Sequence, residues 1–351
     1  MVKMNIAYIV PSLRKLGPVV VTYDLVCRMI DEGHRVTVYF FDNYTDNTIC
    51  FPCPTIRIKI WEKFKFEEYD IVHSHCFRSD FYVFIHKPLG GTKTKFITTI
   101  HNFVFEDLSS QYNKFISSIL GNLWILSVKR HNQIVVLSNV AKEYYKRWFN
   151  SKNLHVIYNT RSLQEKHDLS NEEIEQLMDF KTNCSLIGIN ALLTQRKGID
   201  LAIKALPYID NVKLYIVGDG KIKTELKQLS EKLGISKRVF FAGFKEDAYR
   251  YIKYYDLYLM PSRSEGFPLA LLEAVSLQCN IVVSDIPIFR EFFTDSEATF
   301  FELENNQSLV SAIEYALTHD KSKMAYKRYL SDYTIDKFAQ SYLNIYKTVL
   351  G

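Results

Sequence analysis

The sequence predicts an α/β protein of two doubly wound domains, and three features lead to this prediction. At 351 residues the chain is too long for one ordinary core, so two domains of about 150–200 residues are expected. Short β-rich runs alternate with helical segments along nearly the whole chain. Residues 160–184, which are polar and acidic, interrupt this alternation once before it starts again.

The first half of the chain contains six predicted strands. Several of them are nearly continuous apolar runs, as expected of parallel strands that are buried on both faces. The segments between them are long enough to form helical crossover connections. These strands are predicted at residues 4–10, 35–41, 70–75, 95–101, 133–138 and 154–159.

The second half repeats the pattern, and we therefore expect domains at residues 1–162 and 180–334. Doubly wound sheets bind ligands beyond the carboxyl ends of their strands. With two such sheets, a cleft between the domains is the expected site. The strands of the second domain are predicted at residues 185–193, 212–218, 239–244, 256–261 and 280–285.

Composition excludes several classes of protein. Hydrophobic residues make up 47% and charged residues 24%, which is typical of globular proteins. The longest apolar region, residues 115–128, is shorter than the about 20 residues that span a membrane. The N-terminus lacks the order of a signal peptide, so we expect a cytoplasmic protein. Six cysteines include one Cys-x-x-Cys pair, Cys50 and Cys53, with no second pair for zinc, and reduced thiols are expected.

The net charge of +5 is unevenly distributed, with +8 on residues 1–161 and −3 on the remainder. A basic first half suggests an anionic partner, for which an acidic membrane surface is one candidate and a merely solvated surface the alternative. Residues 109–132 mix aromatic, apolar and basic side chains around a predicted helix. Such a helix either lies in a membrane interface or packs inside the domain. No nucleic-acid partner is expected.

The stretch SRSEGFPLALLEAVS, residues 262–276, places Glu265 and Glu273 on either side of a predicted helix start. Gly266 allows a tight turn, and Pro268 suits a first helical turn. The amides of that turn form an anion site suited to a phosphate. The two carboxylates can accept hydrogen bonds from a sugar hydroxyl and a ribose diol. From the spacing alone, a helix-terminal acid and a surface acid explain the pair equally well.

A second cluster favours the ligand-binding interpretation. In LLTQRKGID, residues 192–200, Arg196 and Lys197 are predicted at another helix start. Adjacent cations near helix amides suit a diphosphate, although an isolated exposed Arg-Lys pair is usually only solvated. The glycine turn VGDG, residues 217–220, adds weak support.

These motifs resemble glycosyltransferase family 4, the large retaining family with the GT-B fold. The family signature of a Glu, seven residues and a second Glu is met by Glu265 and Glu273. The segments KGID, IVGDG, FAGF and FAQSYLNIY also match, and the resemblance runs from residue 4 to about 348. We expect the C-terminal helix, about 335–351, to pack on the first domain.

The resemblance implies a role for each matched residue of the second domain. Glu265 is implied to contact hydroxyls of the transferred sugar, Glu273 to bind the nucleotide ribose and Lys197 to bind the diphosphate. The base is expected beside Gly243 and Phe244. The loop implied to cradle the diphosphate comprises Gly266, Phe267, Pro268, which has no amide hydrogen, and Leu269.

In the first domain the resemblance implies that the backbone of Gly17 approaches the donor phosphate and that His101, at a strand end, lies beside the reacting sugar. His73 and His75 are interpreted as scaffold. One departure is that the family's arginine, five positions before the lysine, is replaced by Leu192, with Arg196 as the candidate substitute.

The implied activity is retaining transfer of a hexose from a nucleoside diphosphate sugar, with a UDP-sugar favoured. The acceptor is a hydroxyl of a saccharide or lipid-linked oligosaccharide in bacterial surface polysaccharide synthesis. Catalysis would come from orientation and from stabilising the leaving diphosphate, with no metal or other cofactor. Two alternatives are a nucleotide-sugar epimerase or hydrolase, and a non-catalytic partner protein, which the leucine at position 192 motivates.

Overall fold

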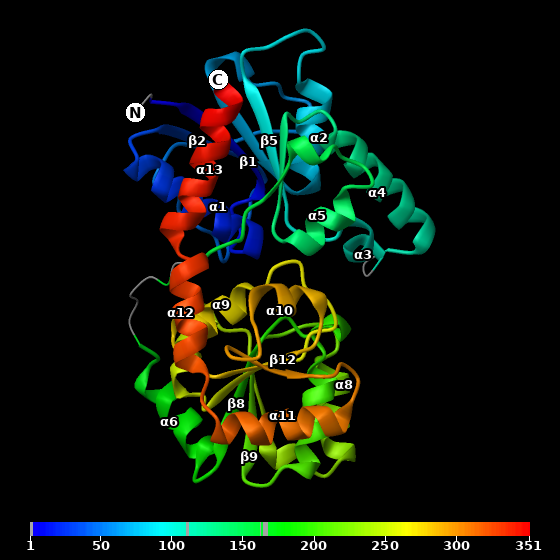
Figure 1. The fold of residues 1–351 in the computed structure, drawn as a ribbon, viewed down its shortest axis with the longest axis vertical. Coiled ribbons are helices and arrows are strands. Elements are labelled where there is room, and N and C mark those ends of the chain that lie inside the picture. Colours follow the sequence, from blue (N-terminus) through cyan, green and yellow to red (C-terminus); the bar gives the residue numbers. More distant parts are fainter. Residues whose placement is uncertain (1–2, 110–111, 162, 164–167) are drawn as a thin grey trace. The chain divides into compact units, whose positions relative to one another are not determined.

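The computed structural model describes residues 3–109, 112–161, 163 and 168–351, and it divides into two compact units (Figure 1). The first unit consists of Met1–Ser162 with Tyr333–Gly351, and the second is Leu163–Asp332. Each unit contains a parallel sheet with helices packed around it, which confirms the predicted α/β class. The second unit begins ahead of residue 180, because it includes helix α6 (Asn171–Lys181).

The sheet of the first unit has seven parallel strands in the order β3-β2-β1-β4-β5-β6-β7. The six predicted strands are all present, and the additional one is β3, whose three residues are all exposed. An exposed run this short carries no apolar pattern that could have predicted it. The strands are β1 (Asn5–Ser12), β2 (Arg35–Asp42), β3 (Thr55–Arg57), β4 (Ile71–His75), β5 (Lys95–Ile100), β6 (Gln133–Val136) and β7 (Leu154–Val156).

The helices of the first unit include one from the end of the chain. Helix α13 packs against α1, and the hydroxyl of Tyr346 lies 3.0 Å from that of Tyr8 and 2.7 Å from His73 Nδ1. The helices are α1 (Gly17–Asp31), α2 (Cys76–His86), α3 (Val104–Ser109), α4 (Lys114–Val128), α5 (Asn139–Tyr145) and α13 (Ile335–Leu350), with 3₁₀ turns η1 (Phe66–Glu68) and η2 (Ser151–Asn153).

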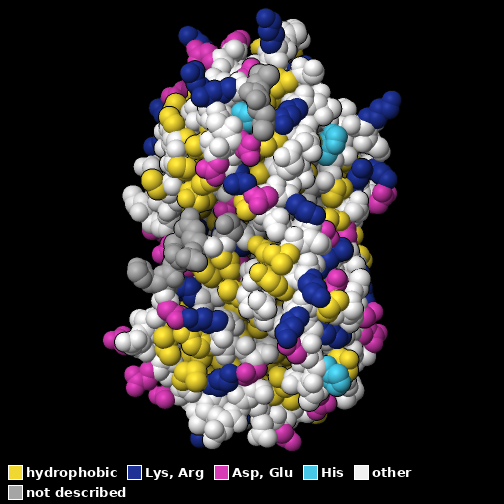
Figure 2. Space-filling view, turned by 60° about the vertical axis from the view of Figure 1, so that its left-hand side comes forward, with side chains coloured by type: hydrophobic (Ala, Val, Ile, Leu, Met, Phe, Trp, Pro, Cys, Tyr) yellow, Lys and Arg dark blue, Asp and Glu magenta, His cyan; other side chains and the backbone are white. Residues whose placement is uncertain are grey.

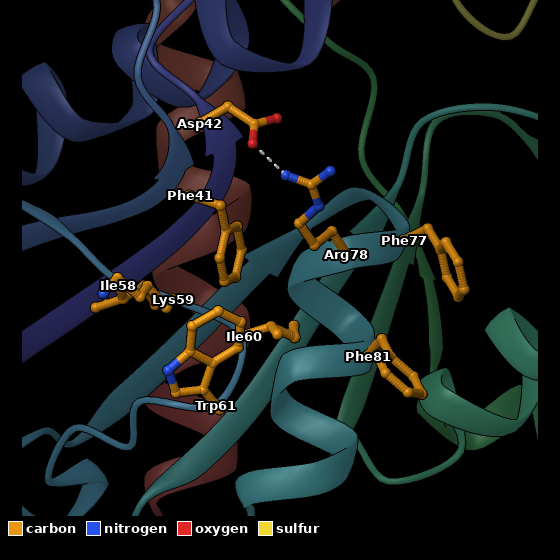
Figure 3. Close-up of a pocket in the computed structure, with 9 residues that line it drawn as sticks. All are labelled: Phe41, Asp42, Ile58, Lys59, Ile60, Trp61, Phe77, Arg78 and Phe81. Carbon is orange, nitrogen blue, oxygen red and sulfur yellow. Dashed lines mark hydrogen bonds and ion pairs between the residues drawn. The ribbon is translucent and has the colours of Figure 1, made fainter.

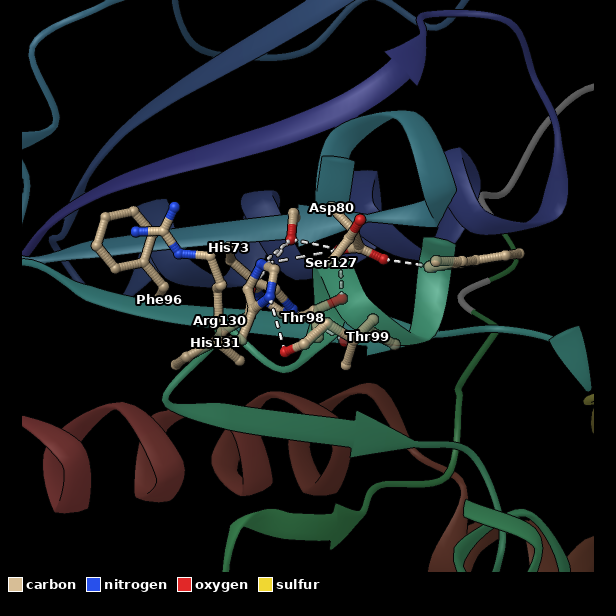
Figure 4. Close-up of polar contacts among 12 residues, drawn as sticks. His73, Asp80, Phe96, Thr98, Thr99, Ser127, Arg130 and His131 are labelled. Carbon is tan, nitrogen blue, oxygen red and sulfur yellow. Dashed lines mark hydrogen bonds and ion pairs between the residues drawn. The ribbon is translucent and has the colours of Figure 1, made fainter. Parts of the chain in front are cut away.

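A buried carboxylate ties α2 to its neighbours in the first unit (Figure 4). Asp80 accepts hydrogen bonds from Ser74 Oγ at 2.7 Å, Thr98 Oγ1 at 2.6 Å and Trp124 Nε1 at 2.7 Å. Burial raises the pKa of Asp80 to about 6, although the three donors act in the opposite direction. Because a buried carboxylate needs such partners, this contact set fixes α2 against β4, β5 and α4.

The sheet of the second unit has six parallel strands in the order β10-β9-β8-β11-β12-β13. Its five predicted strands are present, and the short β13 is additional. Aliphatic side chains from the sheet and from α7, α8 and α11 form one core. The strands are β8 (Ser185–Asn190), β9 (Val212–Val217), β10 (Val239–Gly243), β11 (Leu257–Met260), β12 (Ile281–Ser284) and β13 (Thr299–Phe301).

The helical segments of the second unit connect these strands. The helices after α6 are α7 (Ile199–Ala205), α8 (Lys223–Lys232), α9 (Leu269–Ser276), α10 (Pro287–Phe292), α11 (Asn306–Thr318) and α12 (Ser322–Asp332). The 3₁₀ turns are η3 (Gln195–Lys197), η4 (Leu206–Tyr208), η5 (Ser236–Arg238) and η6 (Ala248–Tyr254).

On the face shown in Figure 2, Lys and Arg side chains are interspersed with Asp and Glu side chains. All six cysteines are free thiols. Within the described part of the chain, every helix is too short or too polar to cross a membrane.

Candidate functional site

Most of the predicted site residues of the second unit lie on loops that follow four neighbouring strands, while Gly243 ends β10 and Leu269 and Glu273 lie in α9. Strands β10, β9, β8 and β11 are adjacent and parallel, so their carboxyl ends share one edge of the sheet. This edge is where doubly wound sheets bind ligands. The loops concerned follow these strands at residues 191–198, 218–220, 243–244 and 261–268.

Gly198 allows two of these loops to touch. The sequence placed Arg196 and Lys197 at a helix start, whereas the structure places them in the 3₁₀ turn η3, and α7 begins after Gly198. Gly198 has φ +63°, and a Cβ there would lie 1.9 Å from the carbonyl oxygen of Pro261. Only glycine fits this position. The Arg263 amide donates to the Arg196 carbonyl at 2.8 Å, which joins the two loops.

The contact brings the predicted cations onto the first glutamate of the signature. The Glu265 side chain is buried, with Lys197 Nζ 2.6 Å from Oε1 and Arg196 Nη1 3.2 Å from Oε2. Ser262 Oγ also donates to Oε1 at 2.6 Å. Burial favours a higher pKa, but the charges of Lys197 and Arg196 and these hydrogen bonds hold the pKa of Glu265 below its ordinary value. The carboxylate is therefore ionised and compensated by two cations.

This cluster can bind an anionic group and, beside it, a hydroxyl group. Two cations against one carboxylate leave this cluster with a net positive charge, and the Arg196 side chain is 42% exposed. Its guanidinium also donates to the Ser264 carbonyl at 2.8 Å, which fixes its direction. An anionic group can be held by the cations while neighbouring hydroxyls donate to Glu265.

Arg263, which the sequence analysis did not single out, supports the cluster. Its guanidinium makes a bidentate pair with Asp200 at 2.8 and 3.0 Å and a third contact with Glu304 at 2.5 Å. The pKa of Arg263 is raised by its hydrogen bonds to these carboxylates. These pairs fasten the 261–268 loop to the start of α7. The only signal for Arg263 in the sequence was its position two residues before Glu265.

The rest of the motif leads into α9. Pro268 is the N-cap residue, and α9 begins at Leu269, one residue later than the prediction that Pro268 forms part of the first turn. Gly266 and Phe267 are partly exposed, whereas the Leu269 amide donates to the Phe267 carbonyl at 3.1 Å and is engaged within the loop. Glu273 lies in the second turn of α9 and is partly buried.

The glycine turn after β9 lies between the loops that follow β8 and β10. A Cβ on Gly218 would lie 1.9 Å from the Ala191 carbonyl oxygen, and the Gly218 amide donates to the Gly243 carbonyl at 2.8 Å. Phe244, the residue predicted beside the base, is 63% exposed. Leu192, which stands where the resemblance implies an arginine, is 64% exposed at the same edge.

In the first unit, His101 follows β5 and contacts His75 at the end of β4. His75 Nδ1 and His101 Nε2 lie 2.9 Å apart. Burial lowers the pKa of His101 to about 3 and holds that of His75 well below its ordinary value, so both rings are neutral and one of them donates. We interpreted His73 and His75 as scaffold from the sequence. This fits His73, whose ring is hydrogen-bonded to Tyr346 and Thr99. It missed the contact of His75 with His101.

Gly17 is the first residue of α1, which follows β1 at the same carboxyl edge as His101. In the described residues, no three His, Cys, Asp or Glu side chains are grouped so that they could hold a metal ion. Independence of metal stays a prediction.

Comparison with known proteins identifies the family. Residues 17–165 match the model of Glycosyltransferase Family 4, and residues 171–331 match that of Glycosyl transferases group 1. The O-antigen biosynthesis glycosyltransferase WclY of Escherichia coli is 33% identical, over 99% of both chains. A UDP-Gal:alpha-D-GlcNAc-diphosphoundecaprenol alpha-1,3-galactosyltransferase of Escherichia coli is 27% identical, over 85% of this chain and 80% of the relative.

The fold has close counterparts among solved structures. The Anabaena protein Alr3699/HepE, solved with UDP-glucose, superimposes with a TM-score of 0.79 at 16% identity, covering 98% of this chain and all of that one. The match confirms the fold, and the relative above confirms the family resemblance. The chain belongs to glycosyltransferase family 4, and it is a glycosyltransferase with the GT-B fold.

Proposed function

We propose that this protein transfers a hexose from a UDP-sugar to a hydroxyl of a lipid-linked saccharide during assembly of a bacterial surface polysaccharide. The observation that carries the proposal is the cluster of Lys197, Arg196 and Glu265 at the carboxyl edge of the second sheet. The relatives support the substrates, since one acts in O-antigen biosynthesis and another joins galactose from UDP-Gal to a sugar on diphosphoundecaprenol.

In the proposed reaction the bond between the anomeric carbon and the diphosphate breaks while the acceptor oxygen bonds to that carbon. Lys197, Arg196 and the amides near Gly266 stabilise the negative charge of the leaving diphosphate. The acceptor's proton passes to an oxygen of that diphosphate. Neutral His101 provides a hydrogen bond that steadies the reacting sugar. Entry and departure on one face of the sugar give retention, and no metal is required for this charge balance.

Glu265 suits a positioning role better than a nucleophilic one. Both of its oxygens already contact Lys197, Arg196 or Ser262, and its pKa is held below the ordinary value by those partners. A carboxylate stabilised in this way is a weak nucleophile but a good acceptor for sugar hydroxyls. The geometry therefore supports front-face attack by the acceptor.

Helix α4 supports peripheral attachment to the inner face of the cell membrane. Its residues Phe115, Ile116, Ile119 and Leu126 are 75%, 40%, 52% and 48% exposed, at a spacing that places most of them on one stripe. Trp124 and others on the opposite side are buried in the unit. Packing inside the domain, one interpretation of residues 109–132, describes the buried face, and the membrane interface is our proposal for the exposed face; residues 110 and 111 lie outside the described chain. An exposed apolar stripe with lysines at both ends suits a membrane interface.

The test is a UDP-release assay with UDP-glucose, UDP-galactose and UDP-N-acetylglucosamine, with and without a sugar-diphosphate-lipid acceptor. We expect release that depends on the acceptor, a product with the anomeric configuration of the donor, and full activity in EDTA. Release without acceptor would instead indicate a hydrolase. An inverted product would contradict front-face attack, and loss of activity with the chelator would contradict independence of metal.

A further inference from the structure

The first unit contains a cavity of about 530 Å³ between β2, the segment after β3 and α2 (Figure 3). Its volume falls in the range of about 300–1,000 Å³ that is usual for ligand sites. In Figure 3, Trp61 lies below Phe41 and beside Ile60, and Arg78 reaches across to Asp42 above them. The remaining lining residues are Ile58, Lys59, Phe77 and Phe81.

The lining combines an apolar surface with net positive charge. Six of its nine residues are aromatic or aliphatic, and Trp61 is 71% exposed. Leaving such a surface in water is unfavourable, so a ligand that covers it is stabilised. Lys59 lies 5.8 Å from the Trp61 ring, and the Arg78 guanidinium lies 5.8 Å from the Phe41 ring. A ligand that matches this lining has an apolar body and an anionic group.

The charged end of the cavity lies at the edge of the sheet that carries His101. Asp42 is the last residue of β2, and Arg78 is in the first turn of α2, three residues after His75. His75 in turn contacts His101 at 2.9 Å. A ligand whose anionic group lies at Arg78 can therefore extend its next group along this edge toward His101, while its apolar part lies over Phe41 and Trp61.

Resting on the proposed function, we propose that this cavity binds the isoprenoid diphosphate part of the lipid-linked acceptor. The isoprenoid packs against Phe41, Ile60 and Trp61, and the diphosphate is held by Arg78. The ion pair of Arg78 with Asp42, at 2.5 Å, competes with the diphosphate and must open when it binds. Both side chains are nearly half exposed, so opening this pair costs little.

Farnesyl diphosphate, a short isoprenoid diphosphate, is the probe for this cavity. The three tryptophans are Trp61, Trp124 and Trp148, and Trp61 is the one at the cavity. We expect farnesyl diphosphate to shift the tryptophan emission to the blue and Trp61→Phe to abolish that shift. Farnesol and the single-phosphate lipid lysophosphatidylglycerol should each bind at least about tenfold more weakly, because they lack the diphosphate. Inorganic diphosphate should leave the emission unchanged.

Three substitutions separate this role from a structural one. Arg78→Gln should weaken farnesyl diphosphate binding at least about tenfold, whereas Asp42→Asn should tighten it about threefold or more by freeing Arg78. Arg35→Gln, at the exposed opposite end of β2, is the matched control and should bind like the unaltered protein. Thermal unfolding of each variant verifies that it is folded.

The outcomes distinguish this proposal from the proposed function. An emission shift with the expected ranking of variants supports the acceptor site. Equal affinity for lysophosphatidylglycerol, equal binding by Arg78→Gln and Arg35→Gln, or no binding at all overturns it. UDP binding measured on the same protein tests the donor site separately, so a chain that binds UDP but not farnesyl diphosphate refutes the cavity alone.

Discussion

The ammonium group of Lys197 lies 2.6 Å from the buried carboxylate of Glu265, although 68 residues separate them in the sequence. The pair joins the loop after β8 to the loop after β11, and Gly198 makes this approach possible. Arg196 completes the cluster from the same turn. The first four predictions concern this cluster, the glycine beside it and the buried histidines of the other unit.

Replacing Glu265 by Gln is expected to separate donor binding from turnover. The cations lose their internal counter-charge, so UDP should bind as well as before or more tightly. Turnover should fall about 100-fold or more, because the sugar is no longer positioned. Calorimetry gives the dissociation constant of UDP, and UDP release gives kcat. A parallel loss of UDP affinity would mean that Glu265 acts only by holding the cations in place.

Replacing Lys197 by Ala should weaken UDP binding by about 30-fold, or about 2 kcal/mol, because a charge that faces the diphosphate is lost. Lys232→Ala is the control, since Lys232 is exposed in the last turn of α8. Titration calorimetry of both variants provides the test. Equal affinities for the two would remove Lys197 from the donor site.

Gly198→Ala should destabilise the second unit by about 2–4 kcal/mol, because the new Cβ meets the Pro261 carbonyl and φ is positive. Gly234→Ala is the control, since Gly234 has φ +70° with nothing within 4 Å of its Cβ position, and only the backbone strain of about 1 kcal/mol is expected. Differential scanning calorimetry compares the two. Similar losses would show that the close approach to Pro261 is unimportant.

The first unit should lose stability as the pH falls from 7 to 5. Burial lowers the pKa of His101 and His131 to about 3, and holds those of His73 and His75 well below the ordinary value. The unfolded chain takes up these protons near pH 6.5 and the folded one does not, so each histidine costs about 2 kcal/mol at pH 5. Asp80, with its raised pKa, acts in the opposite direction but is one group against four.

Tryptophan fluorescence measures this effect selectively, because all three tryptophans belong to the first unit. The unfolding midpoint should fall between pH 7 and pH 5, and His319→Gln, an exposed position in the second unit, should leave that fall unchanged. A midpoint that is the same at both pH values would show that these histidines are not held neutral by burial.

The strands and the loops that carry the site could be predicted from the sequence, and their contacts could not. The predicted strands lie within apolar runs and were recognised from them, whereas the missed β3 and β13 are three-residue strands at the edges of their sheets. The motifs identified Glu265 and Lys197 as candidates. Their contact depends on how closely Gly198 approaches Pro261, and no local pattern encodes that distance.

His75 illustrates the same limit in the first unit. Strands β4 and β5 pair so that His75 lies opposite Thr99, and His101 follows two residues later on the same side. The register of a parallel pair is set by the whole sheet, and the sequence of either strand alone does not reveal it. The cavity at Trp61 was also not predicted. Its lining residues 58–61 directly follow β3, an exposed strand that the sequence pattern did not reveal.

The most direct test of the donor site is calorimetric unfolding with UDP, GDP and ADP, on the unaltered protein and on Glu273→Ala. A nucleotide at about 100 times its dissociation constant adds roughly 2.7 kcal/mol of stability, which shifts the midpoint by a few degrees. We predict a shift with UDP that is absent with GDP and ADP and is lost in Glu273→Ala. If none of the three nucleotides shifts the midpoint, the proposed donor site is wrong, and a non-catalytic partner protein becomes the better account of this chain.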